Sequence, residues 1–259
     1  MPASPAHKPP AILLHSGGMS SRQWRKLSDA LSATHRVLAP DFLGSGANPP
    51  WPEGEPFEFA QDLDLIEKLV LGLGEPAHVV GHSYGGLIAV QLARRIPRSI
   101  ASLTAYDPVA FGVLHAAADA EGLADLARVE EDPIFTDRAL GGSEAWFERF
   151  VDYWNGPGTW RAMPAPGREA FLRVGRKVFL EVWSLMHDRT PASAYANVTA
   201  KALFLTGEKT PAAARRTVAL LAAALPNGRA VTIAGAGHMG PISHAAAVNE
   251  AIVAHLSAS

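Results

Sequence analysis

Cysteine is absent from the 259-residue sequence. Its absence excludes a disulfide scaffold, a thiolate nucleophile, and metal or iron–sulfur sites built from cysteine. A surplus of one charge is also missing, because 23 lysine and arginine residues balance 25 aspartate and glutamate residues. Without a basic surplus, the composition gives no reason to expect binding to nucleic acid or to an anionic membrane.

Long apolar runs are missing too. The apolar runs are short and broken by glycine, proline or charged residues, so we expect no segment that spans a bilayer. The start of the chain lacks the basic segment and apolar stretch of a signal peptide, which predicts a cytoplasmic protein. A hydrophobic content of 48% is typical of a soluble globular chain, and the length suits one large α/β domain or two small ones.

Short, unbroken apolar runs recur along the chain and predict buried strands. They lack the alternation of apolar and polar residues, which indicates a parallel sheet covered on both faces. The predicted strands are Ala11–His15, Val37–Pro40, Ala77–Gly81, Ile100–Tyr106, Ala202–Thr206 and Ala230–Ala234. The predicted helices are Ser21–Ala33, Glu58–Leu71, Leu87–Ile96, Ala212–Ala224 and Ala245–Leu256. Their alternation predicts a doubly wound α/β fold.

One long segment interrupts this alternation. From about Phe111 to Asn197 the sequence contains no convincing strand, but it holds four of the six tryptophans among helix-like stretches. We therefore predict that residues 1–110 and 199–259 form the core domain. Residues 111–198 are predicted to form a helical cap over one edge of the sheet. A small helical domain with an ordinary aromatic core is the other interpretation, and the two are compatible.

A serine motif follows the third predicted strand. Residues Gly81–Gly85 read GHSYG, the G-x-S-x-G pattern of a nucleophile elbow between a strand and a helix. Gly81 and Gly85 suit this sharp turn because neither has a Cβ that would collide with the serine backbone. The helix that begins at Ser83 directs its amides and the positive end of its dipole toward an anion that forms there. A glycine-rich turn with an incidental serine is the alternative, but the strand–turn–helix context favours a nucleophile.

The chain resembles the α/β-hydrolase superfamily over nearly its whole length. Besides GHSYG, the resemblance rests on Leu13–Gly18 (LLHSGG), Ala39–Gly46 (APDFLGSG) and Ala234–Pro241 (AGAGHMGP), which occur in the family's order. It implies the α/β-hydrolase fold: a mostly parallel sheet with helices on both faces and a helical lid insertion. Few residues precede Ala11, so the sheet is expected to be trimmed to about six strands, with Val37–Pro40 at an edge.

The same resemblance implies roles for individual residues. Ser83 corresponds to the nucleophile and His238 to the general base, which must remove the serine proton as the serine attacks. The backbone amides of Tyr84 and Gly17 correspond to the oxyanion hole, whose donors stabilise the tetrahedral intermediate. The loop departs from the family's usual His-Gly pair, because Ser16 follows the histidine.

The third member of the triad departs from the family pattern. Thr210 stands after the penultimate predicted strand, where the family usually places an aspartate, and threonine cannot stabilise an imidazolium as a carboxylate does. Two acids lie between Ser83 and His238 near strand ends. Asp107 ends the strand after the elbow helix, and Glu208 lies close to the usual position. We favour Asp107, with Glu208 as the alternative acid and a site without an acid as the third possibility.

These residues predict a serine hydrolase that acts through an acyl-enzyme on a small, partly apolar ester, thioester, lactone or amide. The implied partner is a small-molecule substrate, no cofactor or metal is implied, and a monomer or homodimer is expected. A hydrolase-like protein that binds a ligand with little turnover is one alternative, supported by the missing aspartate. Lyase or cofactor-free oxygenase chemistry on the same triad is another, because a fold does not fix a function.

Overall fold

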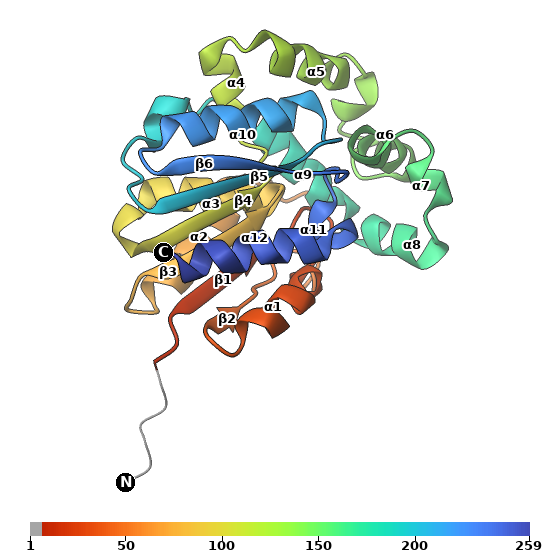
Figure 1. The fold of residues 1–259 in the computed structure, drawn as a ribbon. Helices are drawn as coiled ribbons and strands as arrows, with labels where there is room; N and C mark the ends of the chain where they lie inside the picture. The colour runs from red at the N-terminus through yellow and green to blue at the C-terminus, as the bar shows by residue number, and fades with distance from the viewer. Residues whose placement is uncertain (1–6) are drawn as a thin grey trace.

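A six-stranded sheet forms the centre of the computed structural model, which describes residues 7–259 (Figure 1). Its order is β2-β1-β3-β4-β5-β6, and every adjacent pair is parallel. The strands are β1 (Pro10–Leu14), β2 (Arg36–Leu38), β3 (Ala77–His82), β4 (Ile100–Tyr106), β5 (Lys201–Gly207) and β6 (Gly228–Ile233). The predicted parallel sheet of about six strands and the edge position of β2 are confirmed. The core domain was expected to begin at residue 1, with no targeting segment at the start of the chain. Residues 1–6 lie outside the described residues.

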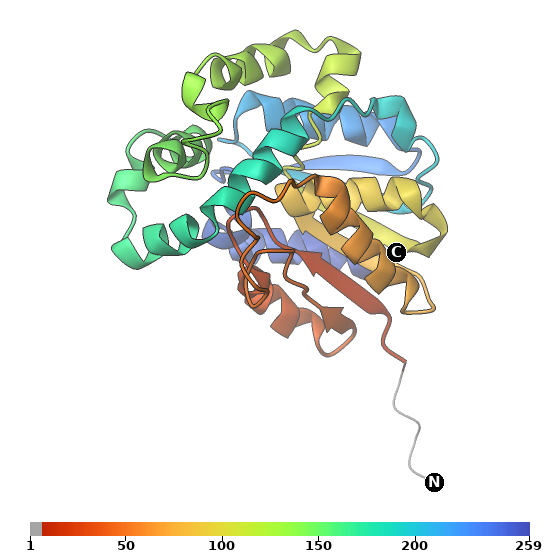
Figure 2. The same cartoon turned by 180° about the vertical axis from the view of Figure 1, so that it is seen from behind.

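Helices cover both faces of the sheet because its strands present apolar side chains in both directions. In β1, Ile12 and Leu14 join one apolar cluster, whereas Ala11 and Leu13 join the other. One face is covered by α2 (Phe59–Leu71), α3 (Tyr84–Arg95) and α10 (Ala212–Ala224), and the other by α1 (Arg25–Leu31) and α12 (Ala245–Ser257). Figure 2 shows α2 and α3 on the near side when the molecule is seen from behind.

Two elements differ from the sequence prediction. The last strand was expected to be covered on both faces, but β6 is largely exposed up to Ile233, because it lies at the edge of the sheet and has a neighbour on one side only. The third helix begins at Tyr84 rather than at Leu87. Gly85 and Gly86 therefore lie inside α3. Because neither residue has a side chain, α3 can approach Pro108 and the end of β1 closely.

The middle of the chain is helical, and residues 107–200 contain no strand within the described structure. Its helices are α4 (Gly112–Ala117), α5 (Ala120–Glu130), α6 (Glu144–Asn155), α7 (Thr159–Ala162), α8 (Ala165–Arg173) and α9 (Gly175–Met186). In both views α6, α7 and α8 lie beyond one end of the strands (Figures 1 and 2). They share an aromatic core that includes Trp146, Phe147 and Trp160. The boundaries of a separate cap domain stay a prediction.

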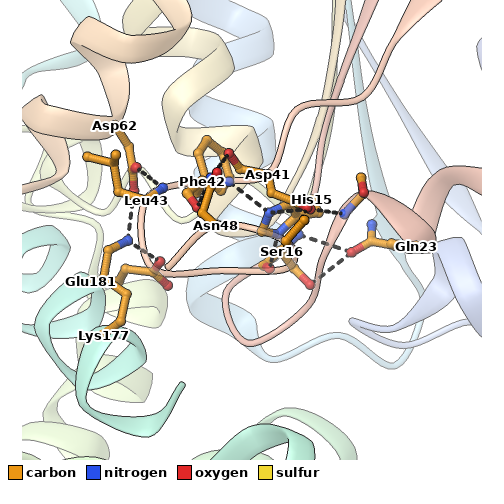
Figure 3. A network of polar contacts seen from close by, with 12 residues as sticks. His15, Ser16, Gln23, Asp41, Phe42, Leu43, Asn48, Asp62, Lys177 and Glu181 are labelled. Carbon is orange, nitrogen blue, oxygen red and sulfur yellow. Dashed lines mark hydrogen bonds and ion pairs between the residues drawn. The ribbon is translucent and has the colours of Figure 1, made fainter. Parts of the chain in front are cut away.

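A buried ion cluster joins α9 to the core. The Lys177 ammonium donates hydrogen bonds to Asp62 Oδ2 at 2.8 Å and to Glu181 Oε1 at 2.7 Å (Figure 3). Asp62, on α2, also accepts hydrogen bonds from the Tyr84 hydroxyl at 2.7 Å and from the Leu43 amide at 2.9 Å. One carboxylate thus connects α9, α3 and the loop after β2, so the cluster fixes α9 beside the strand ends.

We expect Lys177→Met to destabilise the protein by about 3–5 kcal/mol, because it leaves two buried carboxylates without their cation. The matched control is Arg36→Ala, which removes an ion pair to Glu75 whose side chains are 50% and 29% exposed. Such a surface pair contributes less than about 1 kcal/mol. Urea unfolding of both variants measures the difference. A similar small loss in both would mean that the buried cluster does not hold α9 in place.

Candidate active site

Ser83 lies at the junction between β3 and α3. Its backbone has φ 54° and ψ −116°, in the left-handed half of conformational space that non-glycine residues avoid. The turn is so tight that a Cβ at Gly81 would lie 2.2 Å from the carbonyl oxygen of Gly85. A Cβ at Gly85 would lie 2.4 Å from the carbonyl oxygen of Leu14. Both glycines are therefore required by the close backbone approach that presents Ser83 at the end of β3.

A chain of hydrogen bonds links Ser83, His238 and Asp107. Ser83 Oγ lies 3.0 Å from Nε2 of His238, and Nδ1 of that ring lies 3.1 Å from Asp107 Oδ2. A carboxylate accepts hydrogen bonds, so Nδ1 carries the proton and Nε2 is free to accept from the serine hydroxyl. All three residues are buried. They come from three separate strand ends: Ser83 follows β3, Asp107 follows β4, and His238 follows β6.

Thr210, which stands after β5 where an aspartate was expected, contacts the carboxylate of Asp107. Its hydroxyl donates a hydrogen bond to Asp107 Oδ2 at 2.8 Å and accepts one from the Gly207 amide at 3.2 Å. Asp107 has φ 43°, and its amide donates to the carbonyl of Leu205 on β5 at 2.8 Å. The loop after β5 therefore supplies a hydroxyl that orients an acid from β4, instead of supplying the acid itself.

Glu208, the alternative acid, lies elsewhere. Its Oε2 accepts a hydrogen bond from the Gly235 amide at 2.8 Å, and the residue is exposed. The described structure gives it no contact with His238 by hydrogen bond or ion pair. Of the two candidate acids, the structure brings only Asp107 to the imidazole.

Burial shifts the pKa values of His238 and Asp107. Loss of hydration lowers the pKa of His238 to about 3, so the imidazole is neutral at neutral pH and its Nε2 can accept a proton. Burial also raises the pKa of Asp107, and the hydrogen bond from the Thr210 hydroxyl opposes that increase. Beneath the pair, His82 Nε2 lies 2.8 Å from the carbonyl oxygen of His238, which fixes the backbone that carries the ring.

Trp154 is a contact of the site that sequence reasoning missed. Its ring stacks on the His238 imidazole, with centroids 3.7 Å apart and an angle of 20° between the planes. Trp154 comes from α6, far from His238 along the chain. Its sequence context shows only an aromatic residue in a helix with other aromatic residues, so no pattern distinguishes it from the core residue Trp146.

A cavity of about 310 Å³ lies against Ser83 and His238. Most of its wall is apolar, and the helical middle segment contributes much of it. Apolar lining residues from that segment include Phe150, Val151, Trp154, Met163, Phe171, Val178, Val182 and Leu185. Glu181 is the one lining residue with a charged side chain in the described part of the chain. The arrangement suits a substrate with an apolar portion next to the reacting group.

Gly17 and Tyr84 lie together on this wall. An ideal Cβ on Gly17 would be 3.8 Å from Tyr84 Cβ. Within residues 7–259, the amides of both residues have no hydrogen-bond acceptor in the protein. The neighbouring Ser16 amide, in contrast, donates to Gln23 Oε1 at 3.0 Å, as Figure 3 shows. Two adjacent amides beside the serine are therefore available as donors.

Two kinds of feature are absent from residues 7–259. Among residues 7–259 no group of three histidine, aspartate or glutamate residues is placed to hold a metal ion. The described part of the chain also has no helix with the length and apolar character needed to cross a membrane.

Comparison with known proteins identifies the family. The model of the Alpha/beta hydrolase family matches residues 11–251. The chain belongs to this family. The resemblance drawn from its motifs is thereby confirmed.

Individual relatives add detail at lower coverage. The magnesium-chelatase 30 kDa subunit of Rhodobacter capsulatus is 39% identical over 94 residues, which are 36% of this chain and 33% of that protein. A pimeloyl-[acyl-carrier protein] methyl ester esterase of Aeromonas salmonicida is 35% identical over 95 residues, or 37% of this chain and 36% of that protein. The matched segments thus span about a third of these curated relatives.

A similar solved structure extends over the whole fold. The crystal structure of a hydrolase from Pseudomonas aeruginosa PA01 superposes with a TM-score of 0.73 at 25% sequence identity. The superposition covers 97% of this chain and 91% of that one. The similarity therefore includes the helical middle segment as well as the sheet.

Proposed function

We propose that the protein is a serine hydrolase that cleaves a small, partly apolar carboxylic ester through an acyl-enzyme. One observation carries the proposal: Ser83, His238 and Asp107 form a continuous chain of hydrogen bonds beside an apolar cavity. A serine hydroxyl needs a neutral base within hydrogen-bond reach, and the buried imidazole meets both requirements. Thioesters, lactones and amides undergo the same acyl transfer and belong to the same class of substrate.

In the proposed first half-reaction, Ser83 Oγ attacks the carbonyl carbon while its proton passes to His238 Nε2. The imidazolium that forms is stabilised by Asp107 through Nδ1–H. The amides of Gly17 and Tyr84 donate to the oxyanion, and each such donor contributes about 3 kcal/mol of transition-state stabilisation. The carbon–oxygen bond to the leaving alcohol then breaks, and His238 Nε2–H returns the proton to that alcohol.

In the second half-reaction, water takes the place of the alcohol. His238 Nε2 removes a proton from the water, and the hydroxide oxygen attacks the acyl carbon. Collapse of the second tetrahedral intermediate breaks the bond to Ser83 Oγ, which recovers its proton from His238. The products are the carboxylic acid and the free enzyme, so the cycle consumes one water for each ester.

Two further observations support this proposal over a protein that only binds a ligand. That alternative relied on the missing aspartate after β5, but Asp107 lies 3.1 Å from His238 and is itself held by Thr210. The relative from Aeromonas salmonicida is named as an ester esterase, although it matches over 95 residues only. The apolar cavity wall favours an acyl or alcohol portion with little charge.

Ser83→Ala tests the nucleophile directly. Wild-type protein is expected to react with a fluorophosphonate probe and to hydrolyse short-chain p-nitrophenyl esters. The variant should not be labelled, and its kcat should fall by roughly 10³-fold or more, because the attacking oxygen is gone. Intact-protein mass spectrometry and an absorbance assay measure the two effects. Wild-type turnover in Ser83→Ala would show that the elbow serine is not the nucleophile.

A matched pair of variants, Asp107→Asn and Glu208→Gln, tests the acid. On one ester at one pH, Asp107→Asn should lower kcat by about 10³–10⁴-fold. The neutral imidazole loses the carboxylate that fixes its tautomer, and the imidazolium loses its counter-charge. Glu208→Gln should change kcat less than about threefold, since that side chain binds the Gly235 amide on the surface. The reverse pattern would move the acid to Glu208, and two small losses would mean that no carboxylate is needed.

The pH profile tests the buried base. The imidazole acts as a base when it is neutral, so a lowered pKa moves the acid limb of kcat/KM to lower pH. Burial lowers the pKa of His238 to about 3, against 6.5 for an ordinary histidine. With an ordinary histidine as the base, kcat/KM would fall roughly thirtyfold between about pH 7.5 and about pH 5. We expect a far smaller fall for this protein. Activity that returns when samples are brought back to neutral pH excludes acid unfolding, and a limb centred near 6.5 would contradict the expectation.

A further inference from the structure

Glu181 is a buried carboxylate on the cavity wall for which the proposed reaction has no use. The residue is 1% exposed and comes from α9. Lys177 binds its Oε1 at 2.7 Å, but its Oε2 has no hydrogen-bond partner within the described structure. A buried oxygen without a donor is unfavourable for folding, because it loses its hydration and gains nothing in return.

The charges around Glu181 do not balance. The Lys177 ammonium is shared between Asp62 and Glu181, and the Tyr84 hydroxyl donates to Asp62 rather than to Glu181. Burial is the main cause that raises the pKa of Glu181 to about 7, with Asp62 adding to the effect and Lys177 opposing it. A glutamine at this position would keep the bond from Lys177 and remove the surplus charge. The carboxylate is therefore not the best choice for stability alone, and such unfavourable groups concentrate at functional sites.

The unpaired oxygen lies beside the loop that carries the proposed oxyanion hole. An ideal Cβ on Gly17 would be 2.7 Å from Glu181 Oε2, so the oxygen packs directly on that glycine (Figure 3 shows Glu181 beside Lys177). Gly17 and Tyr84 line the same cavity as Ser83. Glu181 lines that cavity too, and its Oε2 packs against the residue whose amide is proposed to hold the reacting carbonyl.

We propose that Glu181 is a specificity-determining residue that binds a hydrogen-bond donor of the substrate, a hydroxyl or an amine one or two carbons from the scissile carbonyl. The proposal rests on the proposed function, because it takes the reacting carbonyl to lie at Ser83. A donor at that place would satisfy Oε2, whereas an apolar ester leaves it unpaired. A site built to hydrogen-bond a substrate group discriminates strongly against analogues that lack the group.

The test compares three esters of the same length: methyl butyrate, methyl 3-hydroxybutyrate and methyl 3-aminobutyrate. For wild-type protein we expect kcat/KM for one donor-bearing ester to exceed that for methyl butyrate by about tenfold or more. The hydroxy and amino esters show which donor is preferred. Glu181→Gln should lose that preference, because its amide places N–H groups where an acceptor was, so that the ratio of the two kcat/KM values falls to about one.

Two controls separate recognition from structure. Glu169→Gln changes an exposed glutamate on α8 and should keep the wild-type preference. Glu181→Gln should unfold at the same temperature as wild type or higher, because the variant removes the surplus negative charge of a cluster with two carboxylates and one ammonium. A variant that melts lower and keeps the preference would show that Glu181 is structural, and would overturn the proposal.

A measurement of binding makes the test independent of turnover. In a Ser83→Ala background, calorimetry compares the Kd of the preferred donor-bearing ester with and without Glu181→Gln. We expect the second substitution to weaken binding of that ester about tenfold more than it weakens binding of methyl butyrate. Equal affinities in both proteins would overturn the role of Glu181, even if hydrolysis is observed. Failure of fluorophosphonate labelling in wild type would instead overturn the proposed function.

Discussion

The hydrogen bonds of His238 depend on where three strands end. Because β3, β4 and β6 run in the same direction, the residues that follow them meet at one edge of the sheet. Ser83 and Asp107 both have a positive φ, so each chain turns sharply as it leaves its strand. The imidazole spans the gap between them at 3.0 Å and 3.1 Å. A shift in strand register would break this chain of bonds, so the packing of the sheet is also what positions the site.

The helical middle segment completes the site rather than merely covering it. Trp154 stacks on the imidazole from α6, and Glu181 reaches the Gly17 loop from α9. The buried bonds from Lys177 to Asp62 and Glu181 fix α9 against α2, so the cavity wall has a defined position. Apolar side chains exclude water from the same space, which lowers the pKa of His238 and strengthens each hydrogen bond inside it.

Much of the sheet could be read from local sequence. Runs such as Ile100–Tyr106 are apolar throughout because both faces are covered, and that strand was predicted with its observed bounds. The edge strand β6 was misjudged, since its sequence looks equally apolar and exposure depends on which neighbours it has. Trp154 and Glu181 were also missed as parts of the site. Their local patterns show an aromatic helix and an i,i+4 ion pair with Lys177, and neither pattern reports contacts with distant loops.

The sequence by itself determined the sharp turn at Ser83, because the backbone geometry there requires glycine at fixed spacing in GHSYG. It also determined the alternation of strands and helices, which is set by local hydrophobic pattern. Only the tertiary structure shows that Asp107, and not Glu208, lies beside the imidazole of His238. Both acids follow strands and lie between the serine and the histidine in the chain, and their separation from the imidazole depends on strand order and loop direction. Distances across a sheet arise from packing of segments far apart in sequence, and no local pattern contains them.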